Sequence, residues 1–211
     1  MTAVSERQRP PLGRRLIDVT EAQQGYFTRA QAHRVSVDDS ALQRGVTSGA
    51  VERLDHGVYR ISGAGYDPHK RLRVAWLRLT PDLSPRERTV RPHLWVSHRS
   101  AAALLDLGVA IADVPEFISD RRLQSRADVK IRVRTGGLDR DSWTAHDGFA
   151  VTTPPRTIAD LADDHIDGGH LGRMASDALA KGLVTESEVA AALGDRTDMD
   201  AILELATGKA R

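Results

Sequence analysis

Three short helical segments followed at once by a β-hairpin occupy the first 61 residues, and this order restricts the folds open to that part of the chain. Apolar side chains recur at helical spacing in the first segment, and two β-prone runs flank a turn that contains Gly57. The predicted elements are helices over 12–24, 28–34 and 38–48 and strands over 51–54 and 58–61. Three helices and a hairpin in this order are typical of a winged helix-turn-helix, here at residues 12–61.

Residues with capping chemistry support these boundaries. Gly25 follows the first helical segment and Gly49 follows the third, and glycine is the residue that most readily ends a helix. Thr28 stands at the start of the second segment, and Asp38, Asp39 or Ser40 stands at the start of the third. Short polar side chains at such positions accept hydrogen bonds from the first free backbone N–H groups of a helix.

The remainder of the chain predicts a mixed domain that ends in several helices. Residues 69–80 read as a connecting helix with Leu72, Ala75, Trp76 and Leu79 on one face and its arginines elsewhere, and residues 81–92 read as a charged loop. Thr185 and Glu188 have the spacing of a capping box. The further predicted elements are strands over 94–96, 116–118, 129–133 and 149–152 and helices over 97–107, 154–164, 171–181, 185–193 and 199–206.

We therefore predict an α+β protein with two domains. An N-terminal winged helix-turn-helix domain with a basic arm covers residues 1–65, and a mixed α/β C-terminal domain covers residues 66–211. The pattern between residues 113 and 148 matches nothing that assigns it a role.

Composition excludes several classes of protein. The chain has no Cys, so it has no disulfide and no thiolate metal site. No apolar run approaches the length of about 18–20 residues that a membrane span requires, and the polar N-terminus does not resemble a signal peptide. We expect a cytoplasmic protein with no membrane association, no cofactor and no metal.

The net charge of +1 conceals an asymmetry along the chain. Residues 1–61 carry 9 basic and 7 acidic side chains, residues 62–140 carry 15 and 9, and residues 141–211 carry 6 and 13. A basic front and an acidic back suggest two different partners, although an unevenly charged solvated surface would give the same numbers.

The third predicted helix is the candidate recognition helix. In a helix-turn-helix this helix enters the major groove of DNA, where Arg reads guanine and Gln reads adenine through two-pronged hydrogen bonds. The preceding helix is placed for phosphate contacts, and the hairpin for an adjacent phosphate or the minor groove. The candidate DNA-binding residues are Ser40, Gln43, Arg44 and Thr47 on the recognition helix, Thr28, Arg29 and Gln31 before it, and Arg53, His56 and Arg60 on the hairpin. The alternative is a tri-helical module that binds another protein.

Catalytic signals are weak, and we predict no catalytic residues. The chain contains no Walker-type phosphate loop, no HExxH and no kinase catalytic-loop or DFG pattern. Ser97–Ser100, with sequence Ser-His-Arg-Ser, places a nucleophile, a base and a cation together, but capping of a helix by Ser97 or Ser100 explains the same residues. Residues 163–167, Asp-Asp-His-Ile-Asp, suit either a cation or an acidic helix end.

Three motifs together resemble the AbiEi antitoxins of type IV (abortive-infection) toxin–antitoxin systems. The first is Gly25-Tyr-Phe-Thr-Arg-Ala-Gln31 followed by Arg53-Leu-Asp-His-Gly-Val-Tyr-Arg60, which is similar to the family's N-terminal winged domain. The second is Val96-Ser-His-Arg-Ser-Ala-Ala102 with Leu104 and Leu107. The third is Val151-Thr-Thr-Pro-Pro-Arg-Thr-Ile-Ala-Asp-Leu161. All three occur in the family's order and span most of the chain.

The resemblance implies a function. The winged domain would bind double-stranded DNA at inverted repeats in its own promoter and repress the operon. The C-terminal domain would neutralise a cognate nucleotidyltransferase-like toxin and could also help to bind DNA. Neutralisation would occur by direct contact, or alternatively by an atypical protein kinase activity that phosphorylates the toxin.

Overall fold

The structure is a computed structural model that describes residues 12–109, 111–124, 127–195 and 198–208. The chain divides into two compact units, residues 1–87 and 88–211. Both units combine helices with a sheet, so the α+β class predicted from the sequence is confirmed. The predicted basic arm lies outside the described residues.

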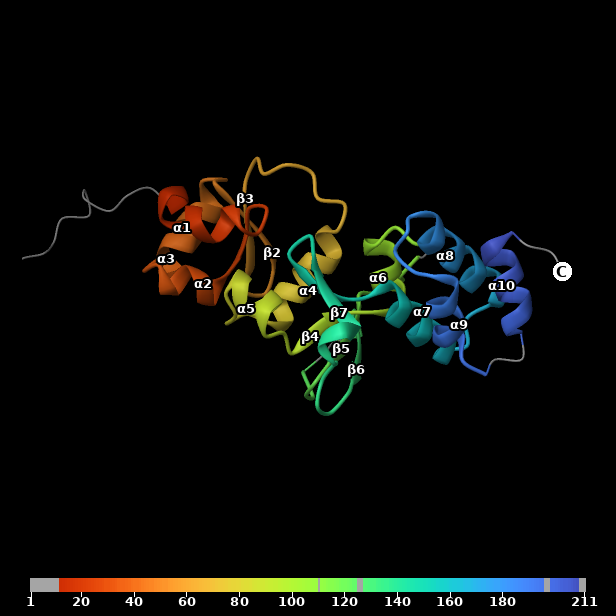
Figure 1. The fold of residues 1–211 in the computed structure, drawn as a ribbon. Helices are drawn as coiled ribbons and strands as arrows, with labels where there is room; N and C mark the ends of the chain where they lie inside the picture. Colours follow the sequence, from red (N-terminus) through yellow and green to blue (C-terminus); the bar gives the residue numbers. More distant parts are fainter. Residues whose placement is uncertain (1–11, 110, 125–126, 196–197, 209–211) are drawn as a thin grey trace, which may run out of the picture. The chain divides into compact units, whose positions relative to one another are not determined.

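The first unit contains helices packed on a small antiparallel sheet (Figure 1). The strand order is β1-β3-β2, and Phe27 and Tyr59 stack across the sheet with ring centroids 5.5 Å apart. A core that includes Leu16, Ala32 and Leu42 lies between helices and sheet. The elements are α1 (Leu12–Glu21), β1 (Tyr26–Thr28), α2 (Arg29–Arg34), α3 (Asp39–Thr47), β2 (Val51–Asp55), β3 (Val58–Ile61) and α4 (Lys70–Leu79), and α5 (Pro85–Val90) spans the boundary between the two units.

The predicted caps of the first unit are confirmed. Thr28 and Gln31 form a capping box at the start of α2, and the Asp38 side chain accepts a hydrogen bond from the backbone N–H of Ala41 at the start of α3. These bonds satisfy N–H groups that have no partner within the helix. The turn of residues 35–38 therefore connects α2 to α3 in a defined geometry.

Three features of the first unit differ from the prediction. The first helix ends at Glu21 rather than residue 24, and residues 26–28 form a strand. Residues 85–90, predicted as loop, form α5. Arg73 of α4, which the prediction placed off the apolar face, is nevertheless buried, with Nε of Arg73 2.9 Å from Oδ2 of the buried Asp67.

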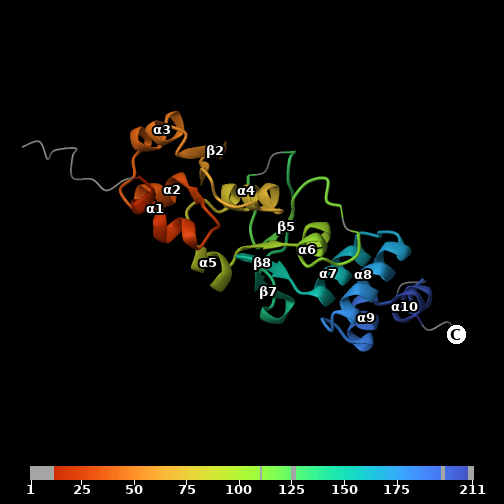
Figure 2. The same ribbon diagram turned by 90° about the horizontal axis from the view of Figure 1, so that it is seen from above.

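The second unit places a five-stranded mixed sheet beside a cluster of helices (Figure 2). The strand order is β6-β5-β4-β8-β7; β4 pairs antiparallel with β5 and parallel with β8. The strand β7 was not predicted. The elements are β4 (Leu94–Val96), α6 (His98–Leu104), β5 (Glu116–Ser119), β6 (Lys130–Val133), a 3₁₀ turn (Arg140–Ser142), β7 (Trp143–His146), β8 (Phe149–Thr152), α7 (Pro154–Asp163), α8 (Gly168–Ala180), α9 (Glu186–Leu193) and α10 (Met199–Thr207).

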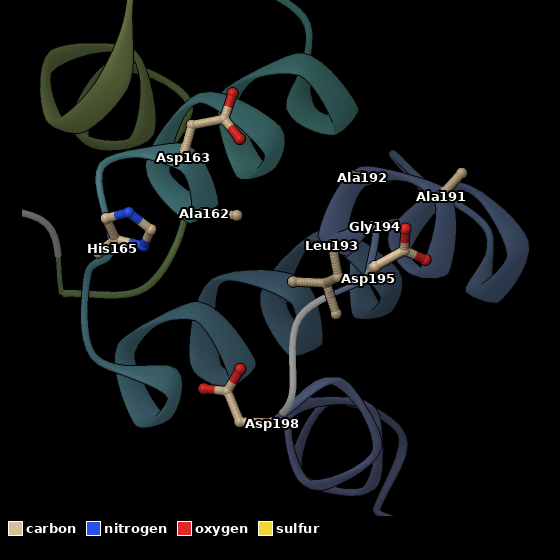
Figure 3. Close-up of a pocket in the computed structure, with 9 residues that line it drawn as sticks. All are labelled: Ala162, Asp163, His165, Ala191, Ala192, Leu193, Gly194, Asp195 and Asp198. Atoms are coloured by element: carbon tan, nitrogen blue, oxygen red, sulfur yellow. The ribbon is translucent and has the colours of Figure 1, made fainter.

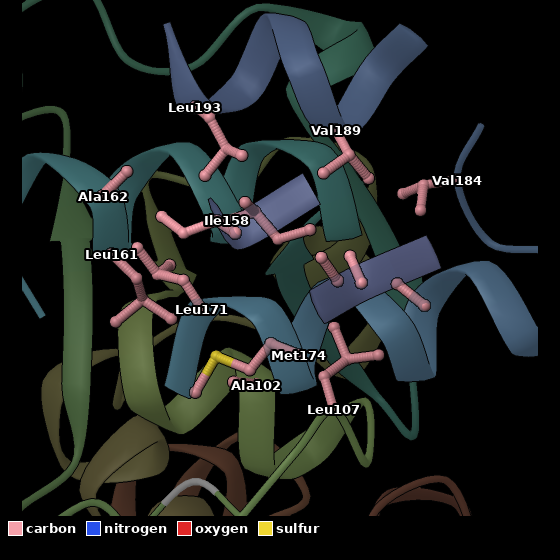
Figure 4. Packing of buried hydrophobic residues seen from close by; sticks show 14 residues of the cluster. Ala102, Leu107, Ile158, Leu161, Ala162, Leu171, Met174, Val184, Val189 and Leu193 are labelled. Carbon is pink, nitrogen blue, oxygen red and sulfur yellow. The ribbon is translucent and has the colours of Figure 1, made fainter. Parts of the chain in front are cut away.

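The main core of the second unit lies among its helices. Apolar side chains from α7, α8 and α9 converge there, with Ile158 and Leu171 fully buried (Figure 4). The capping box of Thr185 and Glu188 at the start of α9 is confirmed. Helices α8 and α10 approach closely because Gly172 has no side chain: a Cβ there would lie 2.5 Å from Cδ2 of Leu205. None of the helices in the described part of the chain is long and apolar enough to span a bilayer.

Candidate nucleic-acid interface

Helix α3 presents a polar stripe to solvent. Ser40, Gln43, Arg44 and Thr47 are all exposed, and their spacing of three and four residues places them on one face of the helix. The opposite face is anchored by Leu42, which is buried in the core. The stripe is therefore held by packing from behind while its own side chains remain available to a ligand.

Three of the ten residues predicted to contact DNA are buried instead. Thr28 is fully buried; its hydroxyl donates to the carbonyl oxygen of Pro81 at 2.6 Å and accepts from the backbone of Gln31. Gln31 is 2% exposed, and its side-chain amide donates to the carbonyl oxygen of Leu83 at 2.9 Å. These two side chains attach the start of α2 to the segment after α4. The phosphate contacts predicted for Thr28 and Gln31 are therefore replaced by contacts within the first unit.

Arg60 is the third of these residues. Its guanidinium carbon lies 4.5 Å from the centroid of the Tyr26 ring, a cation–π geometry, and its side chain donates to the carbonyl oxygens of Gln24 and Gly65. With 8% of its surface exposed, Arg60 ties β3 to the loops on either side of it. A single sequence cannot reveal this role, because the partners come from two other segments.

The remaining cationic candidates, Arg29, Arg53 and His56, are exposed. Arg53 and His56 belong to the β2–β3 hairpin, whose register shifts between Arg53 and Asp55. Arg29 begins α2 and forms an ion pair with Asp39, the first residue of α3. The structure therefore retains seven of the ten predicted side chains at the surface of the first unit: Arg29, Ser40, Gln43, Arg44, Thr47, Arg53 and His56.

A groove of about 460 Å³ connects α2 with the hairpin turn. It contains two residues that the sequence did not single out, His33 of α2 and Arg78 of α4. Arg78 donates to Asp55 at 2.7 Å, which fixes the hairpin against α4. No local pattern predicts this groove, because its walls come from separate elements. The residues that line it are Arg29, Ala30, His33, His56, Gly57, Arg78 and Pro81.

The Ser-His-Arg-Ser motif at the start of α6 lies inside the second unit. Ser97 occupies the capping position but makes no side-chain capping bond; instead its Oγ lies 2.9 Å from Nδ1 of His98. Ser100 accepts a hydrogen bond from the backbone of Glu116. Burial, together with the charge of Arg132, lowers the pKa of His98 to about 3, so its imidazole is neutral. Ser97 and His98 are both buried, so neither is presented to a substrate in this conformation.

A second cavity, of about 960 Å³, lies among the C-terminal helices (Figure 3). Alanines and Leu193 form part of its wall, and Asp163, Asp195 and Asp198 contribute carboxylates. Within the described ranges, no three His, Cys, Asp or Glu side chains are grouped to hold a metal ion.

The first unit, with a turn between two short helices and a sheet beside them, is compatible with a helix-turn-helix protein. Residues 14–62 match the sequence model of a family described as transcriptional regulator, AbiEi antitoxin. Over that segment, this match confirms the resemblance that the motifs predicted. It supports a role as a transcriptional regulator of the AbiEi antitoxin type.

A solved structure shares the fold of most of the chain. It is the crystal structure of the RV2827C protein from Mycobacterium tuberculosis, with 14% sequence identity, a TM-score of 0.52 and coverage of 94% of this chain and 78% of that chain. At this identity the similarity concerns the fold alone. A comparison with curated proteins found no match.

Proposed function

We propose that the chain is a DNA-binding autorepressor in which the first unit acts as a winged helix-turn-helix and the β2–β3 hairpin is the wing. The exposed stripe of α3 carries this proposal, because it displays Gln43 and Arg44, the side-chain types that read adenine and guanine. Ser40 and Thr47 extend the same face. Arg29, Arg53 and His56 would contact phosphates on either side of the stripe.

We further propose that the chain is the cytoplasmic antitoxin of a type IV system, with a nucleotidyltransferase-like toxin as its partner. The family match supports the antitoxin role. DNA binding is assigned to residues 1–65 and antitoxicity to residues 66–211. The segment from residue 154 to 208 carries four basic and eleven acidic side chains. Such a surface complements a basic cleft that binds nucleotides and RNA, and it is unsuited to DNA phosphates.

Salt dependence tests the proposed phosphate contacts. On a duplex that carries the inverted repeats of the operon promoter, the dissociation constant should rise steeply with salt concentration. The logarithm of the association constant, plotted against log [salt], should have a slope of about −0.9 for each phosphate neutralised. Arg53→Ala should therefore reduce the slope by about one and weaken binding to all sequences alike. A slope equal to that of the unaltered chain would remove Arg53 from the interface.

A full-chain variant tests the division of functions. Gln43→Ala combined with Arg44→Ala should abolish repression of a promoter–reporter fusion and still protect cells that express the toxin. The reason is that both side chains are exposed on α3, outside the acidic helices of the second unit. Loss of protection by a folded variant would contradict the division. Protection that requires ATP and leaves a phosphate on the toxin would favour the kinase alternative over neutralisation by contact.

A further inference from the structure

Asp39 binds two of the three exposed basic side chains of α2, Arg29 and His33, while the third, Arg34, donates to the carbonyl oxygen of Asp82. Nε of Arg29 donates to Oδ1 of Asp39 at 2.7 Å, and Nη2 of Arg29 bonds to Oδ2, so the guanidinium fork engages both carboxylate oxygens. Nε2 of His33 lies 2.9 Å from the same Oδ1. The side chains of Arg29, His33 and Asp39 are 51%, 44% and 56% exposed, so all three face solvent.

The fold does not depend on this contact. Ion pairs between exposed side chains contribute little to stability, because water competes for both charges and two long side chains lose freedom. The start of α3 is already capped by Asp38, and the start of α2 by Thr28. The bonds from Arg29 and His33 hold the pKa of Asp39 well below its usual value, so its negative charge persists at every pH at which the protein would work.

A second ion pair at the same groove shows the contrast. Arg78 and Asp55 are joined at 2.7 Å with side chains only 14% and 21% exposed, and they fix the hairpin against α4. If a phosphate displaced Asp55 from Arg78, that attachment would be lost. If a phosphate displaced Asp39 from Arg29, no packing would be disturbed, because both side chains are exposed to water.

We propose that Asp39 is an internal counter-charge that competes with DNA phosphates for Arg29 and His33 and thereby restrains binding to DNA of any sequence. This inference rests on the proposed DNA-binding function. A phosphate that approaches α2 must displace the carboxylate or lie beside it, and both alternatives cost free energy through lost attraction or like-charge repulsion. The cost is the same for every sequence, since no base takes part. Asp39 would therefore weaken binding to the operator and to other DNA by the same factor and would leave the ratio of the two affinities unchanged.

The test is Asp39→Asn in the full chain, measured on the promoter duplex and on a scrambled duplex of equal length across a series of salt concentrations. If Arg29 is released to bind one more phosphate, the slope of the log association constant against log [salt] should become more negative by about 0.9. For affinities that are equal at 1 M salt, this slope corresponds to about eightfold tighter binding at 0.1 M. The gain should be equal on both duplexes, so their affinity ratio should not change.

The controls separate this effect from the others. Asp18→Asn makes the same change of charge on the exposed surface of α1 and should leave the slope unchanged. Adding Arg29→Ala to Asp39→Asn should remove the gain. Weaker binding by Asp39→Asn would show that Asp39 positions Arg29 for DNA, and an equal gain from Asp18→Asn would show an effect of net charge; either result overturns the inference. Failure of the unaltered chain to bind either duplex would instead contradict the proposed function itself.

Discussion

Replacing Asp67 with Ala is expected to lower the free energy of unfolding of the first unit by about 3–5 kcal/mol, because it removes the carboxylate that pairs with the buried guanidinium of Arg73. The Asp67 side chain is fully buried and that of Arg73 is 6% exposed, with 2.9 Å between Oδ2 of Asp67 and Nε of Arg73. The backbone N–H of His69 also donates to Asp67. A domain is typically stable by only about 5–15 kcal/mol, so the loss should be evident in urea unfolding.

The environment of Tyr26 explains why this carboxylate matters. The guanidinium carbons of Arg60 and Arg73 lie 4.5 and 5.8 Å from the Tyr26 ring centroid, and Asp67 pairs with Arg73. Burial, reinforced by the charge of Asp67, raises the pKa of Tyr26 to about 12, so the phenol stays neutral. Asp67 is thus paired by charge with Arg73 of α4 and lies beside Tyr26 of β1.

A double variant and a pH series identify the mechanism. Asp67→Ala with Arg73→Met should recover most of the lost stability, because apolar replacement of a whole buried pair is often neutral. Burial opposes ionisation of Asp67, but the bonds from Arg73 and His69 outweigh it and lower its pKa below the ordinary 3.8. The stabilisation is therefore present above that value and is lost as pH falls through the lower folded-state pKa. The difference between the unaltered chain and Asp67→Asn should shrink below about pH 4. A difference that does not vary with pH would contradict the charge argument.

Replacing Gln43 or Arg44 with Ala is expected to weaken binding to the promoter duplex by about 1–3 kcal/mol each, because each change removes a two-pronged contact to a base. Both side chains are exposed, so the variants should unfold at the same denaturant concentration as the unaltered chain. A competition experiment with single base-pair substitutions should show relaxed preference at one position for each variant.

The control for charge is Arg14→Ala, which removes a cation from the exposed surface of α1. It should leave base preference intact. Retention of both affinity and preference by the Gln43 and Arg44 variants would show that the α3 face does not read bases. The protein-binding alternative for the three-helix unit would then be favoured.

Elements with strong local signals were predictable from the sequence. Thr28, Asp38 and the pair Thr185–Glu188 cap helices through bonds to residues three positions away, and such bonds need no tertiary context. The hairpin follows from two β-prone runs around Gly57, which adopts a positive φ of 70°. The α3 stripe was predictable for the same reason, since helical spacing alone places its members on one face.

Two strands were missed for different reasons. Residues 26–28 form β1 only because they pair with β3, a distant segment, where Phe27 lies opposite Tyr59. Residues 143–146 form β7 by pairing with β8 across the two-residue turn Asp147-Gly148, with Trp143 opposite Thr152. That turn is a local hairpin signal that the sequence does contain.

The sequence by itself determined most of the helices, with α5 the exception, and that α3 would carry Gln43 and Arg44 on one face. Tertiary structure decided which candidate side chains reach solvent. Thr28 and Gln31 are buried by carbonyl groups 53 and 52 residues further along the chain, and Arg60 by the ring of Tyr26. Helical periodicity specifies the direction of a side chain from its own helix axis, whereas burial depends on which remote segment packs there.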